Sequence, residues 1–196
     1  MHIVLASSSE IRQTLLAAAN VSFSVSEANF DEVSVKDALV RSGAKPHDIA
    51  LSLASRKAEK VSRNLRGLVI GCDQVLSIGG KIYSKPKNQS EAREQLNELK
   101  GKSHSLLSAA VICENGQPTW SYVGEVRLTM RNFSDTFLDA YLNRNWPGIQ
   151  NSVGGYKLEE EGVRLFSNID GDYFTILGMP LVEILSYLGQ CGAIDT

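Results

Sequence analysis

The spacing of apolar residues changes along the chain between the period of a helix and that of a strand. Helices are expected over residues 10–19, 46–64, 89–99, 134–142 and 181–188. Strands are expected over residues 2–6, 21–25, 68–78, 82–83, 105–113, 118–130 and 163–166. Strands that alternate with helices, together with two hairpins, predict an α/β fold with a mixed sheet.

Glycine pairs and acidic residues mark the turns between these segments. Gly-Gly at 79–80 and Asn-Gly at 115–116 each lie between two expected strands and indicate hairpins. Residues 29–32 and 169–172 are both interpreted as turns. Ser90 is expected to cap the helix over residues 89–99, because a serine hydroxyl accepts a hydrogen bond from a free backbone N–H.

The chain has 196 residues, of which 43% are hydrophobic and 21% are charged. This composition supports a core and suits a single domain over residues 1–196, without repeats or linkers. The net charge of −2 disfavours a protein that binds nucleic acid, although a local pocket can still attract a small anion. There is no membrane-length apolar run and no secretory signal pattern, so a soluble, cytoplasmic protein is expected.

The three cysteines are far apart and form no Cys-x-x-Cys pair, which argues against a zinc site and a disulfide framework. Cys72 directly precedes an acidic residue, so a nucleophile is one interpretation. A small buried strand residue is the other, and we favour it because free cysteine usually behaves as a small hydrophobic side chain.

A serine-rich turn follows the first expected strand and leads into a helix. Ser7 opens this turn, and Arg12 lies in the first helical turn. A helix that begins after such a turn presents free N–H groups, which bind anions. The alternative is an ordinary capped helix with a solvated arginine, and these residues alone leave both open.

Asp73 interrupts an apolar run, where a buried carboxylate is unfavourable unless it is paired or functional. The motifs of P-loop proteins, dinucleotide-binding folds and serine hydrolases are missing. What remains is a set of acids and bases on expected loops and strand ends, which suits phosphate chemistry. The set is Arg12, Glu32, Lys57, Asp73, Lys85 and Glu159.

Several motifs occur in the order and spacing of one known family. Residues 5–12 are LASSSEIR, where that family has LASxSPRR, and residues 71–75 are GCDQV, where it has GxD[TQ]V. The later matches are KP at 85–86, EAREQL at 91–96, the His104 turn, VGGYKLEEEG at 153–162 and IDGDYFTILGMPL at 169–181. The chain therefore resembles the Maf family of nucleotide pyrophosphatases over nearly its whole length.

This resemblance implies an α/β fold with an elongated mixed sheet and flanking helices in two lobes around a cleft, often as a homodimer. It implies hydrolysis of a small-molecule nucleotide, a nucleoside triphosphate, to the monophosphate and pyrophosphate with Mg²⁺ or Mn²⁺. The implied catalytic residue is Asp73, as the base or the metal-site acid, and Glu32 supports the metal or the water. The implied phosphate ligands are Arg12, Lys57 and Lys85, and Ser7 is expected to be a further substrate-binding residue.

Two positions bear on the nucleobase. Gln74 and Glu159 match the family's 7-methyl-GTP pyrophosphatase subgroup, whereas the thymidine and uridine triphosphate subgroup has Thr and Gln there. A carboxylate at Glu159 can accept two hydrogen bonds from a guanine edge, which favours a guanine-type base.

The chain departs from the family pattern at Glu10, Ile11 and Gln13. Ile11 replaces a tryptophan that would stack on a cationic methylated base. Glu10 brings a negative charge towards the expected phosphate site. Two alternatives therefore stand beside the general pyrophosphatase: an enzyme specific for 7-methyl-GTP, and a non-catalytic nucleotide-binding regulator of cell division.

Overall fold

The computed structural model describes residues 1–195. Its strands are β1 (Ile3–Leu5), β2 (Ser24–Val25), β3 (Leu68–Ile78), β4 (Lys81–Tyr83), β5 (Ser103–Glu114), β6 (Gln117–Met130) and β7 (Phe166–Asp170). Its helices are α1 (Glu10–Ala18), α2 (Glu32–Arg41), α3 (Pro46–Ser62), α4 (Gln89–Leu99), α5 (Asp135–Asn145), α6 (Tyr173–Ile176) and α7 (Leu181–Gln190). Two short 3₁₀ segments, η1 (Val153–Gly155) and η2 (Glu161–Leu165), lie between α5 and β7.

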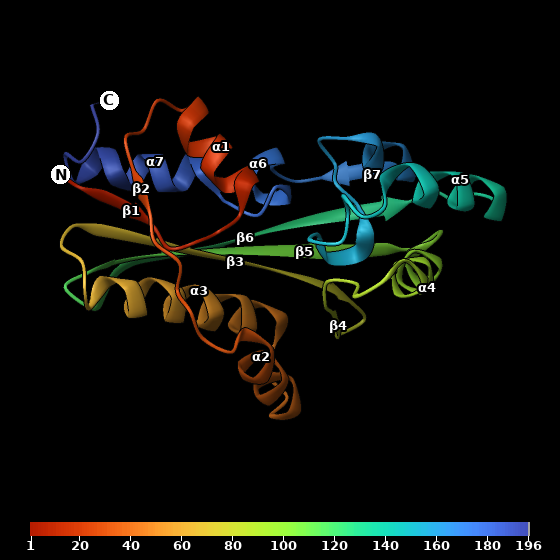
Figure 1. The fold of residues 1–196 in the computed structure, drawn as a ribbon, viewed down its shortest axis with the longest axis horizontal. Coiled ribbons are helices and arrows are strands. Elements are labelled where there is room, and N and C mark those ends of the chain that lie inside the picture. Colours follow the sequence, from red (N-terminus) through yellow and green to blue (C-terminus); the bar gives the residue numbers. More distant parts are fainter. Residues whose placement is uncertain (196) are drawn as a thin grey trace.

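The strands form one mixed sheet in the order β2-β1-β3-β5-β6-β7, and β4 adds to the far end of β3. β1 runs parallel to β2 and β3, whereas the other pairs are antiparallel. The long strands β3, β5 and β6 run through the whole molecule, and helices cover different parts of the sheet at its two ends (Figure 1). The predicted mixed α/β fold with an elongated sheet and flanking helices is confirmed.

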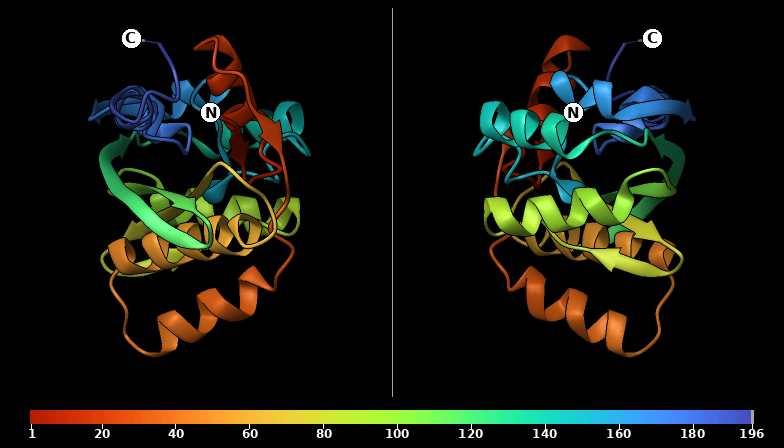
Figure 2. Two further views of the ribbon diagram at one scale, coloured as in Figure 1. Left: turned by 90° about the vertical axis from the view of Figure 1, so that its left-hand side faces the viewer. Right: turned by 90° about the vertical axis from the view of Figure 1, so that its right-hand side faces the viewer.

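Helices cover both faces of the sheet at the end that holds the two termini (Figure 2). On one face α3 packs against β3 and β5 through residues such as Ile49 and Leu53. On the other face α1 and α7 pack against β1 and β3. α3 approaches β3 closely at Gly71, where a Cβ atom would lie 2.3 Å from the carbonyl oxygen of Ala54. Glycine is therefore required there, and it lets α3 side chains reach the next residues of β3.

The opposite end of the sheet carries a second core. There α4, α5 and β7 surround the far ends of β3, β5 and β6, with Tyr141, Tyr156 and Phe166 among the buried residues. The long strands β3, β5 and β6 run through both ends of the molecule, so the two expected lobes share one sheet. No helix within residues 1–195 has the length and apolarity needed to cross a bilayer.

Several local predictions were wrong. Residues 29–32 are not simply a turn, because α2 begins at Glu32. This helix has no fully buried residue, and its apolar side chains Val35 and Leu39 are only partly buried against the core. The last strand is displaced from residues 163–166 to 166–170, since only Phe166 of β7 is buried. Part of the expected turn at 169–172 therefore belongs to β7, and α6 follows it. Asn88, not Ser90, caps α4 by accepting a hydrogen bond from the Glu91 N–H.

Candidate active site

A cleft opens where β1 ends and leaves the edge of β3 uncovered. The last bond between these strands is donated by the Ala6 N–H to the Ile70 carbonyl. Parallel strands of α/β sheets commonly place ligand sites beyond their carboxyl ends. Two adjoining hollows of about 690 and 810 Å³ share Arg12, Lys57 and Glu159 and so form one cleft, which is large enough for a nucleotide.

All eight residues expected at the site line this cleft. They are Ser7, Arg12, Glu32, Lys57, Asp73, Gln74, Lys85 and Glu159. Their roles remain predictions, but the fold brings them together from α1, α2, α3, β3 and three loops. Charged and polar residues that are far apart in the sequence therefore line a single cleft.

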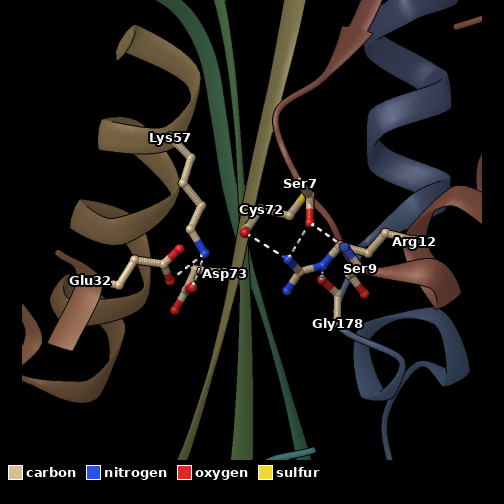
Figure 3. Close-up of polar contacts among 8 residues, drawn as sticks. All are labelled: Ser7, Ser9, Arg12, Glu32, Lys57, Cys72, Asp73 and Gly178. Carbon is tan, nitrogen blue, oxygen red and sulfur yellow. Dashed lines mark hydrogen bonds and ion pairs between the residues drawn. The ribbon is translucent and has the colours of Figure 1, made fainter. Parts of the chain in front are cut away.

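Asp73 belongs to an ion-paired group that is centred on the Lys57 ammonium (Figure 3). The Lys57 ammonium is 2.7 Å from Asp73 Oδ1 and 2.8 Å from Glu32 Oε2. The side chains of Lys57 and Asp73 are only 9% and 12% exposed, whereas that of Glu32 is 47% exposed. Glu32 reaches the pair from the first turn of α2, and Lys57 from the inner face of α3. One ammonium thus holds two carboxylates around a single point.

Arg12 is buried and clamps three segments together. Its Nε donates to the Gly178 carbonyl at 2.8 Å, and its Nη1 donates to the Cys72 carbonyl at 2.9 Å and to Ser7 Oγ at 3.2 Å. Ser7 Oγ also accepts from the Ser9 N–H, which fixes the serine-rich turn before α1. The uncovered edge of β3 makes the Cys72 carbonyl available. Most of the donor capacity of Arg12 therefore holds the cleft together, and Nη2 is the remaining donor group.

The side chains of Gln74 and Asp73 project from opposite faces of β3. Its Nε2 donates to the Ile176 carbonyl at 2.8 Å, to the Thr175 carbonyl at 3.2 Å and to Ser108 Oγ at 3.0 Å. These acceptors fix the amide orientation, because the nitrogen must face them. Gln74 therefore positions α6 against the sheet and leaves Oε1 as the part of its amide free to accept from another group.

Two lysines of the cleft have lowered pKa values. Burial lowers the pKa of Lys85 most, the positive charges of Arg12 and Lys57 lower it further, and Glu32 and Asp73 oppose the shift. Burial also lowers the pKa of Lys36, and Asp73 partly restores it. Lys36 is not among the residues expected at the site, because it lies on α2, a helix that was not predicted from the sequence. The four-residue spacing between Glu32 and Lys36 was the available signal.

The cleft also has an apolar wall, to which Tyr156, Leu158 and Ile176 contribute. Glu159 is exposed next to this wall, and its neighbour Glu160 pairs with Lys157 at 3.0 Å. Ile11 lines the cleft at the position where an aromatic residue was expected for a methylated base. A flat apolar group with polar edges would match this wall.

Cys72 is fully buried among α1, α7 and sheet residues. Burial raises the pKa of its thiol to about 11. The thiol is therefore protonated at neutral pH, which agrees with a structural strand residue and not with a nucleophile.

The fold and the cleft define an α/β protein with a cationic, partly apolar site of nucleotide size. The chain belongs to the Maf family: the family model "Maf-like protein" matches residues 2–191.

A protein of Ruegeria pomeroyi named nucleoside triphosphate pyrophosphatase is 54% identical over 195 residues, covering 99% of this chain and 98% of its own. A protein of Rhizobium meliloti named 7-methyl-GTP pyrophosphatase is 44% identical, covering 98% of each chain. A solved structure of a nucleoside-triphosphatase / dITP/XTP pyrophosphatase from Mycobacterium abscessus aligns with a TM-score of 0.45 and 14% identity, over 98% of this chain and 97% of its own.

Proposed function

We propose that this protein hydrolyses nucleoside triphosphates to nucleoside monophosphates and pyrophosphate. The names of its close relatives support this activity. The observation that carries the proposal is Asp73, held 2.7 Å from Lys57 beside Glu32 in a cleft that also contains Arg12 and Lys85. A carboxylate for the water and several cations for the phosphates are the groups that such a hydrolysis needs.

In the proposed reaction, Asp73 orients a water molecule and accepts its proton. Lys57 binds Oδ1, so Oδ2 is the oxygen that takes the proton. The water oxygen forms a bond to the α-phosphorus, and the bond from that phosphorus to the oxygen shared with the β-phosphate breaks. Pyrophosphate leaves with the electron pair, while Arg12 and Lys85 compensate its charge.

We also propose that a divalent cation, Mg²⁺ or Mn²⁺, takes part. Within residues 1–195 no three His, Cys, Asp or Glu side chains gather into an ion site. The Lys57 ammonium occupies the point between Glu32 Oε2 and Asp73 Oδ1, so a cation would bind the other oxygen of each carboxylate. Mg²⁺ is commonly held by one or two carboxylates together with substrate phosphates. These two residues would hold the cation. When bound, it neutralises phosphate charge and makes water more acidic.

The favoured substrate has a guanine-type base. Glu159 provides a charged acceptor next to the apolar wall, which suits the two adjacent N–H donors of a guanine edge. Specificity for 7-methyl-GTP is the second candidate, favoured by the relatives that carry that name. Ile11 provides no cation–π attraction for a methylated base, so unmodified guanine nucleotides should be accepted as well.

The remaining alternative is a regulator of cell division that binds nucleotides without hydrolysing them. Glu10 lines the cleft and brings a negative charge close to the phosphate site, which favours weakened turnover. We further propose a cytoplasmic homodimer as the working form, which light scattering after gel filtration tests.

The decisive experiment measures pyrophosphate release from a panel of common and methylated nucleoside triphosphates, with Mg²⁺, with Mn²⁺ and with a chelator. Asp73→Asn should lower kcat by about 10²–10⁴-fold, because it removes the proton acceptor without changing side-chain size. Asp195→Asn is the matched control, since Asp195 is exposed and does not line the cleft. Tight nucleotide binding without turnover in either metal would favour the regulator instead.

A further inference from the structure

The cleft contains one lysine of α2, Lys36, that is not among the site residues expected from the family motifs. Lys36 lies four residues after Glu32, so both side chains project from the same side of the helix. Its ammonium donates to the Tyr83 carbonyl at 2.7 Å and to Ser84 Oγ at 3.0 Å. These residues directly precede Lys85, and Lys36, Ser84 and Lys85 all line the cleft.

The positive charge of Lys36 has no direct carboxylate partner. Among the ion pairs of residues 1–195, none includes Lys36 or Lys85. In contrast, Lys57 is paired with two carboxylates, and Arg12 spends Nε and Nη1 on protein acceptors. Lys36, Lys85 and the exposed Lys87 are therefore the lysines of the cleft whose charge, within residues 1–195, is left for an anion.

Protein stability does not account for the position of Lys36. α2 has no buried residue, yet Lys36 is half-buried on it, and the carboxylates of Asp73 and Asp37 only partly offset the unfavourable burial of its ammonium. Both protein acceptors of Lys36 are neutral, and an ammonium has three donors, so one N–H remains for a ligand. A bound polyphosphate would supply the missing negative charge.

We propose that Lys36 binds the triphosphate chain directly, beside Lys85, as a further substrate-binding residue. This inference rests on the proposed function as regards turnover, but the binding of a polyphosphate can be tested without any turnover. The apolar wall with Glu159 lies on other elements of the cleft and receives the base. Lys36 therefore contributes to affinity for the phosphates and not to the choice of base.

The test compares calorimetric binding of inorganic triphosphate and of guanosine to the wild type, Lys36→Met and Lys36→Arg, with Mg²⁺ present. Lys36→Met should weaken triphosphate binding about 10-fold or more, the usual effect of losing a charge-assisted hydrogen bond. Guanosine binding should stay within about twofold, and Lys36→Arg should recover most of the triphosphate affinity because it keeps the charge. Arg41→Met removes an exposed charge from the same helix and should bind triphosphate like the wild type.

Three results would overturn the inference: unchanged triphosphate binding in Lys36→Met, an equal loss of triphosphate and guanosine binding, or a wild type that binds no triphosphate. An equal loss would show that Lys36 only holds the Ser84 segment in place. If the wild type binds triphosphate in a Lys36-dependent way but releases no pyrophosphate from any nucleotide, the inference stands and the proposed hydrolysis fails. Thermal unfolding of each variant confirms that it is folded.

Discussion

Asp73 and Gln74 are neighbours on β3, yet their side chains bind groups on opposite faces of the sheet. Lys57 of α3 donates to Asp73 at 2.7 Å, whereas Gln74 donates to the Ile176 carbonyl of α6 at 2.8 Å. Successive strand residues face opposite sides of the sheet. Asp73 therefore faces Lys57 on one side, and Gln74 holds α6, which follows β7, on the other. The two residues therefore have different expected mutant effects.

Replacement of Gln74 by Glu should destabilise the protein. The new carboxylate would face the carbonyl oxygens of Thr175 and Ile176 and could donate to neither. We expect the free energy of unfolding to fall by about 1–3 kcal/mol, the usual effect of leaving buried polar groups unpaired. Urea unfolding measures this. Gln117→Glu makes the same chemical change at an exposed strand end and should leave the unfolding midpoint unchanged. Equal midpoints for the two variants would show that the Gln74 hydrogen bonds to α6 do not stabilise the protein.

Replacement of Arg12 by Lys should reduce both stability and substrate affinity. A lysine ammonium cannot reproduce the fork that joins the Cys72 and Gly178 carbonyls with Ser7 Oγ. We expect a loss of about 1–3 kcal/mol in unfolding free energy and a higher KM for nucleotides. Arg66→Lys is the control, because Arg66 is exposed before β3. A variant with wild-type stability and KM would show that Arg12 is not a structural clamp of the site.

Glu159→Gln should change the choice of base. The amide accepts without charge assistance, so we expect the ratio of kcat/KM for GTP over UTP to fall about 10-fold. Steady-state pyrophosphate release with both nucleotides measures this ratio. Glu160→Gln is the matched control, since its carboxylate pairs with Lys157 instead of being free for the base. A ratio that falls equally in both variants would indicate a general charge effect.

His104 should make stability depend on pH below neutrality. Burial lowers its pKa from 6.5 to about 4, and its Nε2 lies 2.7 Å from the Tyr156 hydroxyl. Between these values the unfolded chain binds the proton and the folded one does not, so stability falls as pH decreases from about 6.5 to about 4. The contribution is on the order of 3 kcal/mol.

Urea unfolding at several pH values separates this effect from other titrating groups. His104→Gln should be less stable at pH 7 because the contact with Tyr156 changes, but its stability should depend less on pH over this window. His47→Asn, at an exposed position, should follow the wild type. If His104→Gln and the wild type had the same dependence, another group would be responsible.

The apolar pattern predicted the long strands and the main helices well, because β3 and β5 are buried almost continuously and the main helices each bury one apolar face. It failed for β7, of which only Phe166 is buried, and for α2, whose Val35 and Leu39 are only partly buried. The candidate residues Arg12, Asp73 and Lys85 could be selected because they lie in the family motifs, whereas Lys57 lies in none of those motifs and was implied only by the resemblance. Lys36 could not, because its helix carries no such motif.

The sequence by itself determined the fold class, the family and the residue types available for phosphate chemistry. Only the tertiary structure decided how each residue is used: Lys57 bridges Glu32 and Asp73, Arg12 mainly holds backbone carbonyls, and Gln74 points away from Asp73. The physical reason is that hydrogen bonds and ion pairs depend on distances of a few ångströms between elements far apart in the chain. Here the close approach of α3 to β3 and the early end of β1 set those distances.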